Sequence, residues 1–173
     1  MRRLHLASLL ALTLACGGSD GQVADRGRAT ASPSDTPAPA QVDACGLVTA
    51  SEATALFGEV AAREHGVAVT DPSMIGECIW GHDSPLGSHQ LQVRVWASPR
   101  YYTPPEDEFT KPLAVGERGY VRVQAASGVD IAWVQEGRVF ELSYFTVGGA
   151  KMPRAVDRVD AVTELAKRTS AKL

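Results

Sequence analysis

The sequence has no apolar run long enough to cross a membrane, and it has none of the common catalytic motifs. Its N-terminal apolar run extends from Leu4 to Ala15 and contains three polar residues, whereas a transmembrane helix needs about 20 apolar residues. No lysine is followed by Ser or Thr, which excludes a P-loop, and no two glycines are separated by one residue, which excludes the dinucleotide-binding motif. The G-x-S-x-G, S-x-x-K and H-E-x-x-H patterns are also absent.

Candidate metal ligands are few. Zinc requires three or four ligands. The residues that could supply them are Cys45, Cys78, His82, Asp83 and His89. A disulfide between the two cysteines would consume both thiolates, and His82 and Asp83 stand where a predicted strand runs into a loop that contains Pro and Gly. We therefore expect no metal and no cofactor.

A Ser/His/Asp assembly can be drawn from Asp83, Ser84 and either His82 or His89. Neighbouring residues of an extended chain point in opposite directions, so these side chains would converge only in an unusual loop. Nucleophilic catalysis also needs an oxyanion site, and nothing in the sequence suggests one. We therefore expect no catalytic residue and no enzyme activity.

What the sequence does contain is an N-terminal signal that ends in a cysteine. Arg2 and Arg3 precede the apolar run, which ends LTLAC at Cys16. A positive start, a short apolar core and a small residue at the end are features of a secretory signal. The terminal cysteine resembles the lipobox of bacterial lipoproteins, which implies a signal peptide over residues 1–15 and a diacylglycerol with chains such as palmitate on Cys16. An ordinary secretory signal cleaved elsewhere is the alternative.

The region after Cys16 has the composition of a tether. Residues 17–42 number 26 and include no aromatic residue and only two large aliphatic ones, too few to offset the entropy cost of ordering. We predict a lipid anchor followed by a disordered linker over residues 16–42, with a root-mean-square reach of roughly 25–30 Å. Without its first fifteen residues the chain has 15 basic and 20 acidic residues. This balance argues against nucleic acid as a partner, because phosphate binding needs a clustered basic surface.

Residues 43–173 are enough for one domain with a single core. The domain contains two cysteines, Cys45 and Cys78, and an isolated pair in an oxidising compartment typically forms a disulfide. Its clearest element is a helix over residues 50–57, where Thr49 and Glu52 have the spacing of a capping box.

The rest of the domain has mainly the two-residue periodicity of strands. Short turns in the last half force antiparallel hairpins, and Pro153 begins a closing amphipathic helix. We therefore predict an α+β domain, with an antiparallel sheet of five or six strands and an N-terminal and a C-terminal helix packed on one face. The predicted strands cover residues 59–70, 77–82, 91–97, 118–124, 129–135 and 138–147.

The segment 99–112 is the strongest candidate for a binding loop. It contains four prolines and the aromatic residues Tyr101, Tyr102 and Phe109. Long loops inside compact domains are often functional, and tyrosine is enriched at interfaces. The alternative is that these aromatic side chains fold back over an edge of the sheet. Trp96, on the polar face of its strand, is a further candidate, and packing beneath a neighbouring loop is its alternative.

The order of these elements resembles a known family. The sequences DACGLVTASEATALFG, ECIW, VGERGYV and VQEGRVFELSYF precede the closing helix. This pattern is similar to that of a family of small, mostly actinobacterial lipoproteins known only as a domain of unknown function. The resemblance implies a lipid-anchored envelope protein with a disulfide between Cys45 and Cys78, and it implies no catalytic residue.

We therefore expect an extracytoplasmic protein, anchored in the cell membrane or the outer membrane through a diacylglycerol on Cys16. Its domain would act as a non-catalytic binding module for an envelope protein, a cell-wall glycan or another small ligand. Two alternatives remain open. One is an envelope hydrolase whose site carries no known motif, and the other is a carrier of an apolar small ligand on the free face of the sheet.

Overall fold

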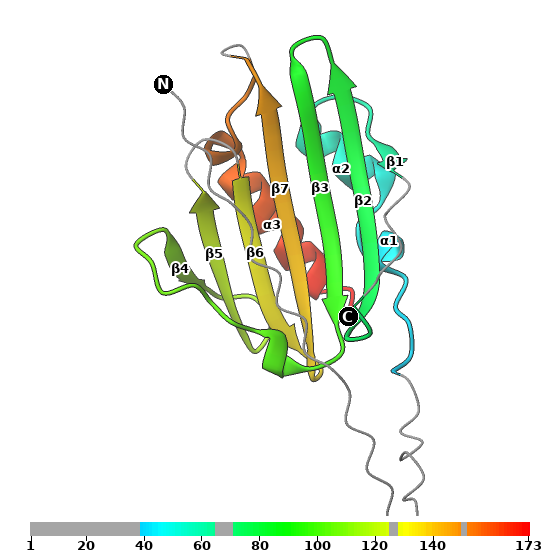
Figure 1. Ribbon diagram of the computed structural model, residues 1–173, viewed down its shortest axis with the longest axis vertical. Coiled ribbons are helices and arrows are strands. Elements are labelled where there is room, and N and C mark those ends of the chain that lie inside the picture. Colours follow the sequence, from blue (N-terminus) through cyan, green and yellow to red (C-terminus); the bar gives the residue numbers. More distant parts are fainter. Residues whose placement is uncertain (1–38, 65–70, 125–127, 150–151) are drawn as a thin grey trace, which may run out of the picture. The chain divides into compact units, whose positions relative to one another are not determined.

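In a computed structural model of the chain, seven strands form one antiparallel sheet in the order β1-β2-β3-β7-β6-β5-β4 (Figure 1). The structure describes residues 39–64, 71–124, 128–149 and 152–173. The predicted signal peptide, Cys16 and the linker up to residue 38 lie outside the described residues. The strands are β1 (Ala62–Glu64), β2 (Met74–Ser84), β3 (Gly87–Trp96), β4 (Thr110–Leu113), β5 (Arg118–Gln124), β6 (Gly128–Gln135) and β7 (Arg138–Gly148).

The α+β class and the antiparallel sheet are confirmed, whereas the prediction of five or six strands is wrong. The additional strand is β4, which begins inside the segment predicted as a loop and contains Pro112. Proline cannot donate a hydrogen bond to a sheet ladder and is tolerated on edge strands. β4 is an edge strand, paired only with β5, so Pro112 fits there. Of the predicted strand 59–70, the described part forms only the short β1, and residues 65–70 lie outside the described residues.

The first predicted helix follows the local signals of the sequence, whereas the closing helix does not begin at Pro153 as predicted, because Pro153 lies two residues before its first turn. α2 (Ala50–Phe57) has the predicted capping box, with the Glu52 amide donating to Thr49 Oγ1 over 3.3 Å and the Thr49 amide donating to the Glu52 carboxylate over 2.9 Å. Gly58 ends it in the left-handed conformation, at φ 79°. The closing helix α3 (Val159–Ser170) is preceded by the 3₁₀ turn η2 (Ala155–Arg158). The short α1 (Ala44–Leu47) was not predicted.

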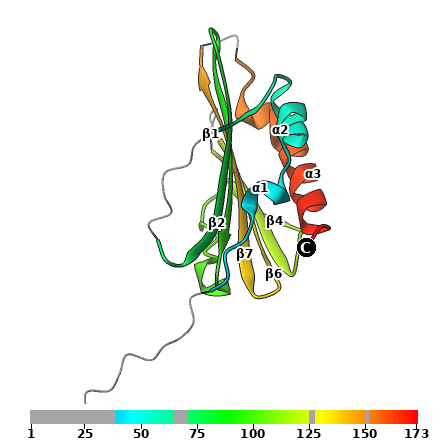
Figure 2. The same cartoon turned by 90° about the vertical axis from the view of Figure 1, so that its right-hand side faces the viewer.

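The three α-helices within the described residues lie on one face of the sheet, which makes a two-layer domain (Figure 2). The core fills the space between the layers. Leu91, Val93 and Val95 of β3 are 0–2% exposed and face the helices, as their alternation in the sequence predicts. Val162 and Leu165 of α3 are equally buried and close the core from the helix side.

The disulfide between Cys45 and Cys78 is present, with 5.1 Å between the two Cα atoms. It ties α1 to β2, two elements that are far apart in the sequence. Trp80 lies two residues further along the same face of β2, and its indole Nε1 donates to the Val48 carbonyl over 3.1 Å. Together the two contacts fix the N-terminal helices on the sheet.

Candidate functional site

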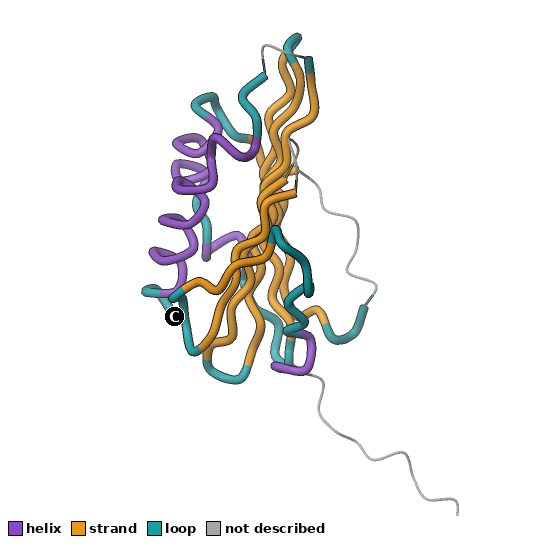
Figure 3. Tube along the Cα trace, turned by 90° about the vertical axis from the view of Figure 1, so that its left-hand side faces the viewer, coloured by secondary structure: helices purple, strands orange, loops and turns teal. Residues whose placement is uncertain are grey.

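None of the α-helices that the structure describes lies on the second face of the sheet (Figure 3). Side chains alternate between the faces of a strand, so the residues next to the core positions point away from the helices. We call this surface the open face. Its central residues are Glu77, Ile79, Gln90, Gln92, Arg94, Trp96, Tyr120, Arg122, Asp130, Ala132, Glu141, Ser143 and Phe145.

Charged side chains in the middle of the open face are paired with one another. Arg94 lies opposite Glu77 in β2 and opposite Glu141 in β7, and its Nε donates to Glu77 over 3.0 Å. Glu141 also accepts hydrogen bonds from the Ser143 hydroxyl at 3.1 Å and from the indole of Trp96 at 3.4 Å. The side chains of Arg94, Glu77 and Glu141 are 30%, 10% and 24% exposed. They are therefore held in place and still reach solvent.

A separate set of hydrogen bonds runs from Gln92 toward β1. Gln92 Nε2 donates to Gln90 Oε1 over 3.0 Å, and Gln90 Nε2 donates to Glu64 over 2.9 Å. The Glu64 carboxylate occupies the space above Gly81, where a Cβ atom would collide with it. In both bonds a side-chain Nε2 donates, and the side-chain oxygen of Gln92, Oε1, accepts no hydrogen bond from the described residues.

On the other side of the open face, Asp107 anchors the predicted binding loop. It accepts hydrogen bonds from Thr110 Oγ1 at 2.7 Å and from Arg122 Nε at 2.8 Å. The hydrogen bond from Thr110, followed by that from Arg122, lowers the pKa of Asp107. Asp107 stands between Glu106 and Glu108 in this loop. Its carboxylate is bound to β5 through Arg122 and is not available as a free charge for a partner.

The aromatic side chains that were predicted to bind a partner lie in two pairs and one exposed position. Trp96 stacks on Tyr101 with 5.5 Å between ring centroids, and Tyr102 packs against Tyr120 at 5.6 Å. These four half-buried rings cover a small apolar cluster on the open face, formed by Ala132, Val134 and Val139. Phe109 stands apart and is 51% exposed.

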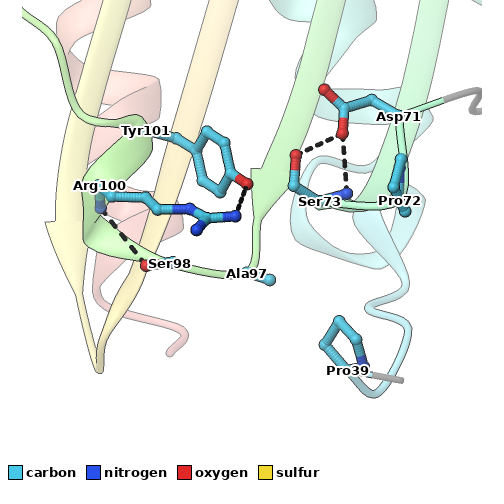
Figure 4. A pocket seen from close by; sticks show the side chains of 8 residues that line it. All are labelled: Pro39, Asp71, Pro72, Ser73, Ala97, Ser98, Arg100 and Tyr101. Carbon is cyan, nitrogen blue, oxygen red and sulfur yellow. Dashed lines mark hydrogen bonds between the residues drawn. The ribbon is translucent and has the colours of Figure 1, made fainter. Parts of the chain in front are cut away.

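A pocket of about 300 Å³ opens at one end of the sheet (Figure 4). We call it the end pocket. Arg100 and Tyr101 of the 3₁₀ turn η1 (Pro99–Tyr101) approach it from one side, and Asp71 and Ser73 from the other. The lining residues are Pro39, Asp71, Pro72, Ser73, Ala97, Ser98, Arg100 and Tyr101.

Charges of both signs meet in the end pocket. Ser73 donates from its hydroxyl and, over 2.8 Å, from its amide to Asp71, which lowers the pKa of that carboxyl, and the nearby Arg100 lowers it further. Hydrogen bonds with Ser73 and Arg100 also lower the pKa of Tyr101. Asp71 and Ser73 were not predicted as site residues, although Asp-Pro-Ser is a typical turn sequence, because only the fold brings this turn next to Arg100.

The candidate metal and catalytic residues are used in other ways. Cys45 and Cys78 are joined, and within the described residues no group of three His, Cys, Asp or Glu side chains is placed to hold a metal. Ser84 closes the β2–β3 turn, because its hydroxyl donates to the Gly87 carbonyl over 3.1 Å and accepts from the Leu86 amide at 3.2 Å. Asp83 is exposed on the face opposite His82.

The two candidate histidines, His82 and His89, lie on the helix side of the sheet. His89 is 3% exposed, stacks on Phe57 at 5.3 Å and has its Nδ1 2.8 Å from the Tyr144 hydroxyl. Burial lowers the pKa of His89, with a further contribution from Arg158, and burial raises the pKa of Tyr144 to about 12. His82 Nδ1 is 2.9 Å from the Val60 carbonyl, and its Nε2 faces Glu59. The contacts of His89 pack the core beneath α2, whereas those of His82 hold the segment after α2 against β2.

Comparisons with known protein families, with curated proteins and with solved structures found no match. The resemblance to a lipoprotein family therefore stays a prediction. None of the helices that the structure describes is long and apolar enough to cross a membrane.

Proposed function

We propose that this protein is a lipid-anchored component of the cell envelope whose domain is a non-catalytic binding module. The signal that ends at Cys16 supports the anchor, and the linker composition supports a domain held away from the membrane surface. Disulfides persist in oxidising compartments, so the bond between Cys45 and Cys78 supports an extracytoplasmic location.

One observation carries the binding role: the α-helices pack on a single face of the sheet, and the open face is a preorganised polar surface. Its long side chains are fixed by hydrogen bonds such as those of Arg94 to Glu77 and of Gln92 to Gln90. A surface whose side chains are ordered before binding loses less conformational entropy when a partner docks. Ordering of this kind favours recognition over a purely solubilising role.

The two alternatives receive less support. An apolar ligand on the open face would have to desolvate Arg94, Glu77 and Glu141, which is costly. For a hydrolase, two of the candidate residues have structural roles, because Ser84 closes a turn and His89 is buried in the core. Binding through the open face is therefore the function that we put forward.

Photocrosslinking in intact cells tests this proposal. A photoreactive amino acid replaces Gln92 on the open face in the full chain, and a matched variant carries it at Glu164, which is exposed on α3. We expect a crosslinked species from position 92 and none from position 164. Equal crosslinking from both positions, or none from position 92, would contradict a binding role for the open face.

A further inference from the structure

Arginines lie beside three carboxylates of the open face, Glu77, Asp107 and Glu141, whereas Glu64 and Asp130 accept hydrogen bonds from neutral glutamine amides. Five carboxylates accept hydrogen bonds from neighbouring side chains on the same surface. They are Glu64, Glu77, Asp107, Asp130 and Glu141. In the end pocket, Asp71 and Arg100 likewise offset one another. A polyanionic partner would need a basic patch, but Arg94 and Arg122 of the open face each lie beside a carboxylate.

The same groups retain unused capacity for hydrogen bonds. A carboxylate has about four acceptor sites and a guanidinium has five N–H donors, whereas each of these groups makes only one to three bonds with its neighbours. The side-chain Oε1 of Gln92 accepts no hydrogen bond from the described residues. Acceptors and donors thus alternate across β2, β3 and β7. This pattern suits hydroxyl groups, each of which both donates and accepts.

A dry protein interface fits this surface poorly. The buried centre of such an interface is depleted of charged residues, and removing water from an ion pair such as Arg94–Glu77 is costly. A hydroxyl-rich ligand, in contrast, replaces water hydrogen bonds with similar ones and leaves bridging waters in place. The chemistry of the open face therefore favours a wet interface with a neutral polar partner.

Aromatic groups border the polar surface at the end pocket. Trp96 and Tyr101 stack there, and Tyr101 also lines the pocket. The Arg100 guanidinium also lies over the Tyr101 ring, 4.7 Å from its centroid, so the pocket has an apolar wall beside a charged group. The pocket volume of about 300 Å³ lies at the lower end of the range for small-ligand sites.

Building on the proposed binding function, we infer that the open face and the end pocket bind a neutral, hydroxyl-rich glycan chain. The chain would lie across β2, β3 and β7, with its hydroxyls on Gln92, Arg94 and Glu141. One end of the chain would enter the end pocket between Tyr101 and Asp71.

NMR titration of the isotope-labelled full chain tests this inference. The probes are chitohexaose, cellohexaose and mannohexaose, each added up to about 5 mM, which detects millimolar Kd values. A phosphocholine detergent keeps an acylated chain soluble, because glycoside detergents would themselves compete for a glycan site. We expect at least one hexasaccharide to shift the amide signals of β3 and β7 around Gln92 and Glu141.

Variants then locate the site. We expect Gln92→Ala and Arg100→Ala each to weaken binding about five- to tenfold, as expected for the loss of one or two hydrogen bonds. Glu164→Ala on α3 should leave the Kd unchanged. A heparin hexasaccharide of the same length serves as the polyanionic probe and should bind more weakly than the neutral sugar.

Three results would overturn the glycan inference. They are no shift on the open face with any neutral hexasaccharide, tighter and salt-sensitive binding of the heparin probe, and shifts confined to the helix side. The proposed binding function fails separately. Position 92 can crosslink in cells to a discrete, protease-sensitive species while the hexasaccharides do not bind. That result would support the proposed binding function and contradict the glycan inference.

Discussion

The phenol ring of Tyr101 stacks on the indole of Trp96 with 5.5 Å between ring centroids, and this contact joins the end pocket to the open face. Tyr101 follows Pro99 in a 3₁₀ turn directly after β3, so the turn folds the chain back over the strand that it has just left. The stack thus positions a wall of the pocket.

Removing either ring should destabilise the domain. We expect Tyr101→Ala and Trp96→Ala each to lower the free energy of unfolding by about 1–3 kcal/mol, because both rings are half-buried. The double variant should show a coupling energy of about 0.5–1.5 kcal/mol, the usual value for an aromatic pair. Urea denaturation of the four proteins measures this coupling, and strictly additive effects would contradict the stack.

Reduction of the disulfide should have a larger effect. The bond between Cys45 and Cys78 closes a loop with a sequence separation of 33, for which the chain-entropy model gives about 3–4 kcal/mol. We expect Cys45→Ala/Cys78→Ala to lose about 2–4 kcal/mol of stability, measured by denaturation. The wild type with reductant should match the double variant. Equal stability of the oxidised and reduced proteins would show that the bond does not constrain the fold.

The buried His89 should make stability depend on pH. Because burial lowers the pKa of His89 in the folded state, the folded protein takes up its proton at lower pH than the unfolded chain does. The contribution of His89 to stability is therefore complete above its unfolded pKa of about 6.5, and it is lost as pH falls through the folded pKa.

Denaturation midpoints between about pH 7.5 and pH 5 measure this effect, a window that lies above the ordinary carboxyl pKa values. We expect the midpoint of the wild type to fall with pH, and we expect a smaller fall in His89→Gln. Identical slopes for the two proteins would mean that His89 does not titrate as its burial requires.

Lipidation at Cys16 is tested by the intact mass of the protein extracted from membranes. We expect a chain that begins at Cys16 and carries the mass of a diacylglyceryl group, since two acyl chains are needed for stable anchoring. Cys16→Ser should appear in the soluble fraction, and Cys45→Ala/Cys78→Ala serves as a control that keeps the anchor. An unmodified mass, or a chain that starts after Cys16, would remove the proposed membrane anchor.

The parts of the fold that the sequence predicts well are those with local signals. The capping box of Thr49 and Glu52 requires only three residues of separation, and α2 begins and ends where it was predicted. The β6–β7 hairpin turns at Glu136 and Gly137, which both have positive φ values of 50° and 70°. This is the geometry of a tight two-residue hairpin.

The parts that the sequence did not predict depend on contacts between distant segments. The first half of β3 contains Ser88, His89 and Gln90 and has no apolar alternation in the sequence. The core position in this half is occupied by His89, which is buried against Phe57 and Tyr144. The end pocket forms only when the turn at Asp71 meets Arg100. Neither relationship leaves a periodic pattern in the sequence.

Cysteine labelling in intact cells measures whether a partner occupies the open face in the envelope. Gln92→Cys and Glu164→Cys variants of the full chain are exposed to a small membrane-impermeant maleimide, both in cells and as purified proteins. We expect position 92 to react at least about tenfold more slowly in cells than in the purified protein, as a bound partner with 90% occupancy would cause. Position 164 should react at the same rate in both settings. Equal rates for position 92 in cells and in solution would mean that no partner occupies the open face.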